Sequence, residues 1–374
     1  MSVPTPLRYG IVGAGYFGRE FARILADIPN AMLVGVYSPG SGAALADEAN
    51  CADAADLAEL LDEIDVVIIA SPNYAHLEPV IAAASRGVHV FCEKPVALSY
   101  AECDAMVAAC ERAGTLFMAG HVLHFMPGIE RAAELVDNGA IGTPIVGRAV
   151  RTGWEDGTRA PGWKKTRALS GGHHFHHIHE LDVLQRLMGA ADTATMITGP
   201  VPQAGSRVGD EDPILLATLT IPDARYASLE WGSVHRNPQH YIEVQGTVGH
   251  LRIDMHDVGI TVHGMDRTER FPLHASTEVD AERTRNNQAT TSGGGVTYGD
   301  ASHRPPEWLR AGMLRELEYF DGLIRGTIPM TASWASLTDG TAARSSIATA
   351  TALTRAAVSR RTVRVSDITG AASS

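Results

Sequence analysis

The feature that most constrains this chain is a glycine turn near its start. A short apolar run, Tyr9 to Val12, leads into Gly13, Gly15 and Gly18 in the pattern G-x-G-x-x-G, and a helix-like stretch from Arg19 to Asp27 follows. The apolar run AMLVGVY then completes a βαβ unit. Gly13 permits a tight turn, Gly15 lets a pyrophosphate approach the backbone, and Gly18 lets helix and strand pack closely. The pattern predicts dinucleotide binding at the helix N-terminus.

The segment after the second strand leaves the type of dinucleotide open. NAD binding usually places a carboxylate at this point to hold the ribose 2′-hydroxyl, whereas an arginine suits the 2′-phosphate of NADP. The sequence here is Tyr37-Ser38-Pro39-Gly40-Ser41, with neither an acid nor an arginine. Ser38 and Ser41 can hydrogen-bond either cofactor. We expect NAD, with NADP as the alternative.

The alternation of strands and helices continues and brings charged residues to a strand end. Val66 to Ala70 is wholly apolar, as in a parallel strand covered on both faces, and ends at Ser71-Pro72-Asn73. The next strand, Val88 to Cys92, ends at Glu93-Lys94-Pro95. In open α/β sheets ligands bind outside the carboxyl ends of the strands, so Lys94 is expected beside the cofactor. A salt-bridged turn is the structural alternative.

Composition limits the partners. The 374 residues include 45% apolar side chains, enough to bury the cores of two domains. The formal net charge of −12 argues against a nucleic-acid surface and against an anionic membrane. The N-terminus lacks a basic region followed by an apolar core, so the cytoplasm is the expected location. The four cysteines form no C-x-x-C pair and are interpreted as reduced thiols.

The second half of the chain has a different pattern. Runs such as ILLATLTI, YASLEWGSV and HYIEVQG alternate apolar with polar residues, which is typical of an antiparallel sheet with one covered face. We therefore predict an N-terminal domain over 1–125 and a C-terminal domain over 126–374. Residues 275–306 are polar and glycine-rich and predict a long loop, followed by helices over 307–325 and 336–359.

The motifs together carry a family resemblance. The glycine turn, Ser71-Pro72-Asn73 with His76, and Glu93-Lys94-Pro95 resemble the Gfo/Idh/MocA family of NAD(P)-dependent oxidoreductases. The resemblance implies an N-terminal Rossmann domain with a doubly wound parallel sheet, and a C-terminal α/β domain with a large, mostly antiparallel open sheet. It implies a sugar, glycoside or cyclitol as substrate and gives Lys94 a catalytic or substrate-positioning role. The cofactor residues expected on this basis are Gly13, Gly15, Tyr16, Phe17, Gly18, Ser38, Ser71, Pro72, Asn73, His76, Glu93, Lys94 and His121.

The segment SGGHHFHHIHELD resembles the helix that carries the family's catalytic histidine. The match assigns that role to His179, with Asp182 three residues later on the same helix face. An imidazole can accept and release a proton at neutral pH, and the Lys94 ammonium can stabilise charge on the same oxygen. Where the family often has an aspartate, this chain has Phe175. The remaining histidines, His173, His174, His176 and His177, would point in divergent directions, so we expect no metal site.

Three further residues are expected to bind substrate together with Asp182. They are His124, where the family often has an arginine nearby, and Trp163 and Lys165, whose aromatic and cationic side chains suit a sugar ring.

The expected reaction is hydride transfer at a secondary hydroxyl or ketone, including oxidation at C3 of a glycoside. The alternatives are a non-catalytic NAD(P)-binding regulator, and a glycoside hydrolase or lyase that uses bound NAD transiently. The resemblance also implies a dimer or tetramer paired through the antiparallel sheet.

Overall fold

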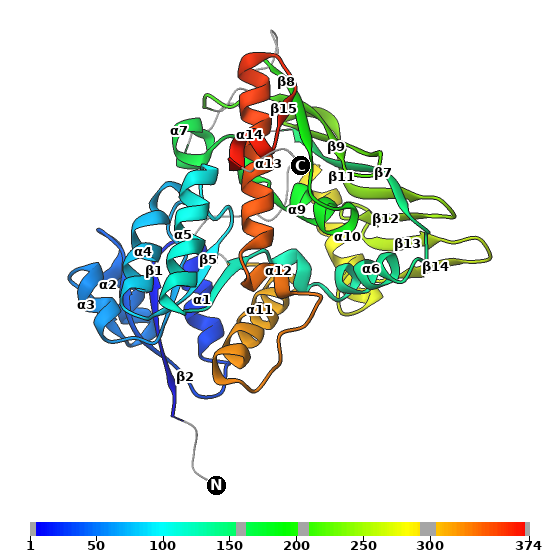
Figure 1. Cartoon of the computed structure of the whole chain (residues 1–374). Helices are drawn as coiled ribbons and strands as arrows, with labels where there is room; N and C mark the ends of the chain where they lie inside the picture. The colour runs from blue at the N-terminus through cyan, green and yellow to red at the C-terminus, as the bar shows by residue number, and fades with distance from the viewer. Residues whose placement is uncertain (1–4, 155–161, 201–208, 292–303, 371–374) are drawn as a thin grey trace. The chain divides into compact units, whose positions relative to one another are not determined.

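The computed structural model describes residues 5–154, 162–200, 209–291 and 304–370 (Figure 1). The chain divides into two compact units. The N-terminal unit contains residues 1–97, 101–122 and 297–343, and the C-terminal unit contains residues 98–100, 123–296 and 344–374.

The N-terminal unit is built on a parallel sheet of six strands. They are β1 (Leu7–Val12), β2 (Ala31–Tyr37), β3 (Ala52–Asp53), β4 (Val66–Ile69), β5 (His89–Glu93) and β6 (Phe117–Gly120), in the order β3-β2-β1-β4-β5-β6. All four residues of β4 are fully buried, as expected for a strand covered on both faces. The strand order reverses between β1 and β4, which is where such sheets bind ligands.

Five helices connect these strands: α1 (Tyr16–Leu25), α2 (Gly42–Ala49), α3 (Leu57–Asp62), α4 (Leu77–Ser85) and α5 (Tyr100–Ala113). Helix α1 buries Phe21, Ile24 and Leu25 and leaves Arg19 and Arg23 partly exposed, so one face packs on the sheet. The doubly wound parallel sheet predicted for the N-terminal domain is confirmed.

One helix far along the chain belongs to the N-terminal unit. Helix α11 (Glu307–Arg325) is tied to β1 by a hydrogen bond of 2.8 Å from the Tyr9 hydroxyl to Asp321, and to α1 by the Arg310–Glu20 ion pair at 2.5 Å. The predicted domain division placed every residue after 125 in the C-terminal domain. The two units differ from it in this segment, because the partners of α11 lie on β1 and α1.

The C-terminal unit is built on a sheet of nine strands. They are β7 (Pro144–Trp154), β8 (Thr193–Gly199), β9 (Ile214–Ile221), β10 (Arg225–Gly232), β11 (Val234–Gly246), β12 (His250–Asp254), β13 (Gly259–His263), β14 (Thr268–Phe271) and β15 (Val363–Arg364). Their order is β14-β13-β12-β11-β7-β10-β9-β8-β15, and β7 with β10 is the parallel pair. The predicted large, mostly antiparallel sheet is confirmed.

Helices and exposed side chains distinguish the faces of this sheet. Helix α9 (His179–Met188) packs on β7 and β11, and α6 (Pro127–Asp137) packs on α9 and β13. Short helices α7 (Arg167–Ser170), α8 (His173–His176) and α14 (Ser366–Thr369) and two 3₁₀ turns, η2 (Val122–Phe125) and η3 (Trp163–Lys165), complete the connections. On one face of the sheet the apolar side chains Val146, Ile197, Leu216 and Tyr226 are exposed.

Three expectations about single elements were wrong. Residues 277–291 form helix α10 (Thr277–Thr291) inside the predicted loop, and residues 292–303 of that loop lie outside the described residues. The helix predicted over 336–359 is divided into α12 (Ala335–Thr338) and α13 (Thr341–Ser359), because Gly340 adopts a left-handed conformation with φ +77°. The apolar run TLFMAGHVLHF, residues 115–125, predicts a strand to Phe125 at the end of the first domain, but the strand ends at Gly120 and a 3₁₀ turn follows.

Across the described ranges, no helix is both long enough and apolar enough to span a membrane.

Candidate active site

The glycine turn has the shape that a dinucleotide needs. Gly13 has φ +107°, and a Cβ there would lie 2.6 Å from the backbone nitrogen of Ser71 at the end of β4. A Cβ on Gly18 would overlap the carbonyl oxygen of Gly13, so helix and strand touch. A Cβ on Gly15 would meet no atom of the described residues within 4 Å. The space above Gly15 is therefore open at the start of α1, where the helix N-terminus favours a phosphate.

The start of α1 leaves this space to a ligand. In the part of the chain that the structure describes, no side chain caps its N-terminus, and the first turn holds no acidic residue that would compete with a bound pyrophosphate. Tyr16 and Phe17 follow Gly15 directly, and their rings pack edge to face with centroids 5.1 Å apart. The residues present fit the predicted cofactor.

At the end of β2, the two serines predicted for ribose binding are joined to each other. The hydroxyl oxygens of Ser38 and Ser41 are 2.8 Å apart. A carboxylate that the sequence analysis missed lies beside them: the Asp53 carboxylate occupies the position that a Cβ on Gly42 would need. Asp53 comes from β3, a strand of two residues whose pattern is too short to recognise in a sequence.

His76 links two of the predicted cofactor segments. Its ring is 1% exposed and lies between two carbonyl oxygens, with Nε2 at 2.9 Å from that of Ser71 and Nδ1 at 3.1 Å from that of Val96. Burial lowers the pKa of His76, so the ring is neutral and donates one of these bonds at a time. His76 therefore connects the turn after β4 with the turn after β5, and its ring nitrogens face protein.

The Glu93-Lys94-Pro95 turn follows β5 at the same edge of the sheet. The Glu93 carboxylate accepts a hydrogen bond of 3.1 Å from the backbone N–H of Lys94, which fixes the backbone from which the lysine extends. Glu93 pairs with Gly120, the last residue of β6. The next residue, the buried His121, therefore lies close to this turn. Ser71, Pro72 and Asn73 follow β4, the strand next to β5. The N-terminal unit thus gathers the predicted cofactor residues along one sheet edge.

In the C-terminal unit, two predicted substrate residues form a buried pair. Nε2 of His124 lies 2.6 Å from Oδ2 of Asp182, and the Ser346 hydroxyl donates to Oδ1 of Asp182 at 2.9 Å. All three side chains are buried. Both oxygens of Asp182 are engaged, so its carboxylate orients His124.

A second buried network was not predicted. The Oε1 atom of Glu180 accepts hydrogen bonds from Arg151 at 3.1 Å and from His240 at 2.7 Å. Burial opposes ionisation of Glu180, but the charge of Arg151 and the bond from His240 outweigh it and hold the pKa of Glu180 well below its usual range. His179 begins α9 directly before Glu180 and is partly exposed. This network fixes the helix turn that carries the predicted catalytic histidine.

Three of the histidines before α9, His173, His174 and His177, are neutral at physiological pH. Burial lowers the pKa of His173 to about 3 and of His174 to about 4, and it brings the pKa of His177 well below its usual value. The charges of Arg151 and Lys165 add to this effect at His173 and His177. Within the described ranges, no three His, Cys, Asp or Glu side chains are arranged to hold a metal ion.

The last predicted substrate residues lie on η3. Lys165 is paired with the buried Glu211 at 3.3 Å, and Glu211 also accepts a bond of 3.3 Å from the Ser170 hydroxyl. Lys165 is therefore held by a carboxylate that the sequence analysis did not single out. Trp163 is partly exposed, with the Lys164 ammonium 5.8 Å from its ring centre.

Comparisons with known proteins match both units. Residues 7–121 match the NAD-binding Rossmann fold of the Gfo/Idh/MocA oxidoreductase family, and residues 133–365 match the family's C-terminal α/β domain. The chain is 44% identical over 365 residues to a 2,7-anhydro-N-acetylneuraminate hydratase of Mediterraneibacter gnavus, covering 97% of each protein. It is 40% identical to the Escherichia coli protein of the same name, covering 97% of this chain and 98% of that one.

The fold comparison gives the same architecture. A crystal structure of an Agrobacterium radiobacter oxidoreductase in complex with NAD⁺, L-tartaric acid and magnesium aligns with a TM-score of 0.77 at 19% identity, covering 97% of this chain and 99% of that one. At that identity the likeness shows the fold alone.

Proposed function

The chain belongs to the Gfo/Idh/MocA family of NAD-binding oxidoreductases, and on that premise we propose that it is a hydratase of 2,7-anhydro-N-acetylneuraminate that uses bound NAD transiently. The observation that carries this proposal is the 44% identity to a hydratase of that substrate over 97% of both proteins. Addition of water opens the anhydro bridge and yields N-acetylneuraminate.

The proposed reaction begins with the oxidation of a hydroxyl group to a ketone. This hydroxyl lies two carbons away from the carbon whose bond to the bridging oxygen is later broken. The bound nicotinamide supplies a hydride acceptor for this step and a hydride donor for the last one. His179 removes the hydroxyl proton, and the Lys94 ammonium stabilises the negative charge that develops on the oxygen. We propose the proton-transfer role for His179 and the charge-stabilising role for Lys94 separately, each from its own unit.

The ketone formed in this way acidifies the C–H bond on the carbon between it and the bridge. Removal of that proton breaks the bridging C–O bond, and the released oxygen takes up a proton and stays on the sugar as a hydroxyl. Water then adds to the carbon that lost the bridging oxygen. The middle carbon regains a proton, and hydride return restores the hydroxyl. A histidine side chain can act as the base in the C–H step, and we assign this role to His124, which Asp182 orients. The balance consumes one water and releases no NADH.

The test is turnover of the pure protein in D₂O. With 2,7-anhydro-N-acetylneuraminate we expect N-acetylneuraminate that carries deuterium on the carbon between the ketone position and the former bridge, without accumulation of NADH. Release of one NADH per substrate would instead indicate a simple dehydrogenase. A protein that binds NAD but converts neither this compound nor a panel of sugars, glycosides and cyclitols would be a regulator.

For the cofactor we propose NAD in preference to NADP. The Asp53 carboxylate lies beside Gly42, whose backbone N–H donates to the Ser38 carbonyl oxygen at 3.0 Å. A negative charge near the Ser38 turn repels a ribose 2′-phosphate and suits a free 2′-hydroxyl.

For the assembly we propose a dimer or tetramer paired through the exposed sheet face of the C-terminal unit. Ile197 is 69% and Tyr226 52% exposed in the single chain, next to Val146 and Leu216 on neighbouring strands. An apolar face of this kind typically marks a protein interface. Leu216→Lys is expected to give monomers by light scattering, whereas Val358→Lys, at an exposed apolar residue of α13, leaves the assembly intact. A monomeric wild type at micromolar concentration would reject the interface.

A further inference from the structure

Glu316 is a buried carboxyl group to which no role has yet been assigned. It lies in the middle of α11 with an exposed fraction of 0%, and neither of its oxygens has a hydrogen-bond partner among the described residues. Burying a lone carboxylate costs several kcal/mol, so a structural role alone does not account for this residue.

The neighbours of Glu316 on α11 place it at the carboxyl edge of the parallel sheet. One turn later, Phe320 packs on Phe91 of β5 with ring centres 6.1 Å apart. One turn earlier, a Cβ on Gly312 would lie 3.0 Å from Val122, just beyond β6. Glu316 therefore lies between these contacts, level with the ends of β5 and β6. Glu93 ends β5 at this level, and its charge acts on Glu316.

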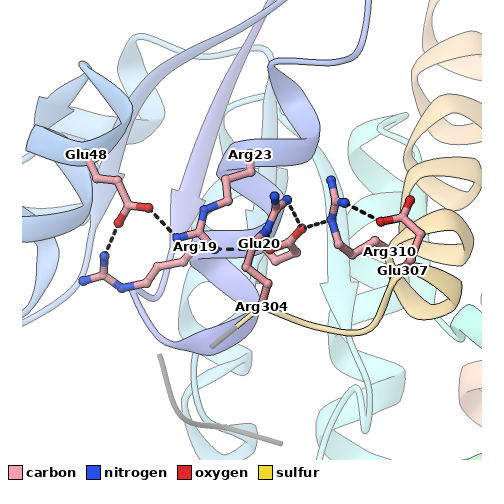
Figure 2. Close-up of polar contacts among 7 residues, drawn as sticks. All are labelled: Arg19, Glu20, Arg23, Glu48, Arg304, Glu307 and Arg310. Atoms are coloured by element: carbon pink, nitrogen blue, oxygen red, sulfur yellow. Dashed lines mark hydrogen bonds and ion pairs between the residues drawn. The ribbon is translucent and has the colours of Figure 1, made fainter. Parts of the chain in front are cut away.

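Helix α11 is fixed in this position at both ends. Glu20 of α1, itself fully buried, accepts from Arg310 at 2.5 Å and from Arg304 at 2.9 Å, as Figure 2 shows. At the other end Asp321 accepts from Tyr9 at 2.8 Å and from Arg325 at 2.6 Å. The helix is thus held against α1 and β1, and Glu316 stays beside the turn that carries Lys94.

Two carboxylates at this place would repel each other. Burial raises the pKa of Glu316 well above its usual range, and the charge of Glu93 raises it further. The Glu93 carboxylate accepts the hydrogen bond from the Lys94 backbone N–H, and this bond needs a carboxylate oxygen to stay next to that N–H. One negative charge on the pair keeps this bond, whereas a second charge on Glu316 would push Glu93 away from it.

The other charged or titratable groups on the elements around α11 have partners of their own. Glu20 is matched by arginines, Asp321 by Arg325 and Tyr9, and His89 accepts from the backbone N–H of Leu116. Arg19 and Arg23 of α1 pair with Glu48, Arg8 of β1 pairs with Asp65, and Glu307 of α11 pairs with Arg310. Further charged or titratable groups on these elements are His121 after β6 and Arg315 and Glu318 on α11 itself.

We propose that Glu316 is a positioning residue for the cofactor site: it holds a proton at neutral pH, so that Glu93 carries the single negative charge that fixes the Lys94 turn. Loss of this proton at higher pH loosens the turn and weakens NAD binding. The proposal requires NAD binding by the N-terminal unit and is independent of the substrate.

The first measurement is thermal unfolding of the cofactor-free protein against pH. A carboxyl whose pKa is higher in the folded than in the unfolded chain binds more protons when folded, so its contribution to stability falls as pH rises above its usual value of 4.5. Glu316→Gln cannot ionise. We expect its Tm to exceed that of the wild type by roughly 2–4 °C or more at pH 8, and the difference to shrink toward pH 5.

The second measurement separates positioning from mere burial. Between pH 6 and 9 we expect the Kd of the wild type for NAD to rise by about threefold or more, and that of Glu316→Gln to stay nearly constant. Glu318→Gln, an exposed glutamate two residues along the same helix, should follow the wild type. If Glu316→Gln does not fold, Glu316→Met takes its place with the same expectation. Parallel Kd profiles for wild type and variant, whatever the Tm values, would overturn the proposal.

Discussion

The two units hold their functional side chains in different ways. In the N-terminal unit the predicted residues follow strands directly, in short runs such as Gly13 to Gly18 and Glu93 to Pro95, and backbone geometry places them. In the C-terminal unit the polar groups meet across long stretches of chain: His124 with Asp182 over 58 residues, and Glu180 with His240 over 60. A site made by backbone turns is visible in the sequence, whereas a site made by side-chain networks emerges only on folding.

The largest expected effect tests the backbone site. Gly15→Asp fills the open space at the start of α1 and adds a negative charge where a pyrophosphate is expected, so NAD binding should be lost. Aspartate is a favoured N-cap residue, so the fold should be kept or slightly stabilised. Isothermal titration with NAD and a thermal melt measure the two effects separately.

The matched control is Gly199→Asp, because a Cβ on Gly199 would also meet no described atom within 4 Å and its backbone is not left-handed. It should bind NAD like the wild type. Undiminished affinity in a folded Gly15→Asp protein would show that the cofactor lies elsewhere.

The second prediction tests the chemistry assigned across both units. His179→Ala should lower kcat by on the order of 10²–10⁴-fold with NAD affinity nearly unchanged, since it removes a positioned proton-transfer group. Lys94→Ala removes a positive charge that is expected to bind the substrate and to stabilise negative charge on its reacting oxygen. KM should therefore rise while kcat falls. Steady-state kinetics on the same substrate measures both.

His176→Ala serves as the control, since His176 is a partly exposed histidine three residues before His179. Normal turnover in the His179 variant together with a loss in the His176 variant would move the acid/base role to His176.

The third prediction concerns acid stability of the C-terminal unit. The pKa of His174 and of His240 is lowered to about 4 by burial, and that of His173 to about 3, against an unfolded value near 6.5. The unfolded chain therefore binds more protons between pH 6.5 and 4, and stability falls as pH falls through this window. Each such histidine removes about 1.4 kcal/mol of unfolding free energy per pH unit there.

Thermal melts from pH 7 to pH 4.5 measure this loss. His174→Gln keeps a donor for Thr354, which accepts from His174 at 2.9 Å, and should reduce the pH dependence. His256→Gln, in the turn between β12 and β13, should not change it. An unchanged slope in the His174 variant would mean that this ring is not neutral in the folded chain.

The fold could be predicted because its signals are local. The parallel strands are apolar on both faces, whereas the antiparallel strands alternate apolar with polar residues. Gly13, Gly15 and Gly18 each meet a steric requirement that the structure displays. Helix α10 was missed because its polar, weakly amphipathic sequence resembles that of a loop. Helix α11 was predicted with its observed bounds, but its attachment to the N-terminal unit depends on Tyr9 and Glu20, more than 280 residues away.

The site was predicted in part for the same reason. Lys94 and the residues after β4 could be placed from the ends of strands. The partners of Glu180, Asp182 and Lys165 could not be predicted. The sequence around an arginine in a strand or a serine in a helix does not indicate which distant side chain it will contact. The segment HELD contains a signal that was not used, since a glutamate next to the predicted catalytic histidine needs a cation if its helix face packs on a sheet.

The smallest expected effect concerns Asp53, a side chain from β3 that lies at the expected cofactor site after β2. β3 pairs with β2 through Val36 and Asp53, which brings this exposed carboxylate to the turn that carries Ser38 and Ser41. The charge is solvated, so its interaction with a 2′-phosphate is weak and falls with salt.

Asp53→Asn should therefore raise the affinity for NADP relative to NAD by about threefold at low ionic strength, and by less in high salt. The ratio of the two Kd values from fluorescence titration is the measurement, because it cancels any general effect on the cofactor site. Asp47→Asn removes the same charge from an exposed position on α2 and should leave the ratio unchanged. Equal shifts in both variants would mean that the net charge of the unit, rather than the place of Asp53, discriminates against the phosphate. No shift in either would leave the choice between NAD and NADP to Ser38 and Ser41, whose hydroxyl groups can bind both.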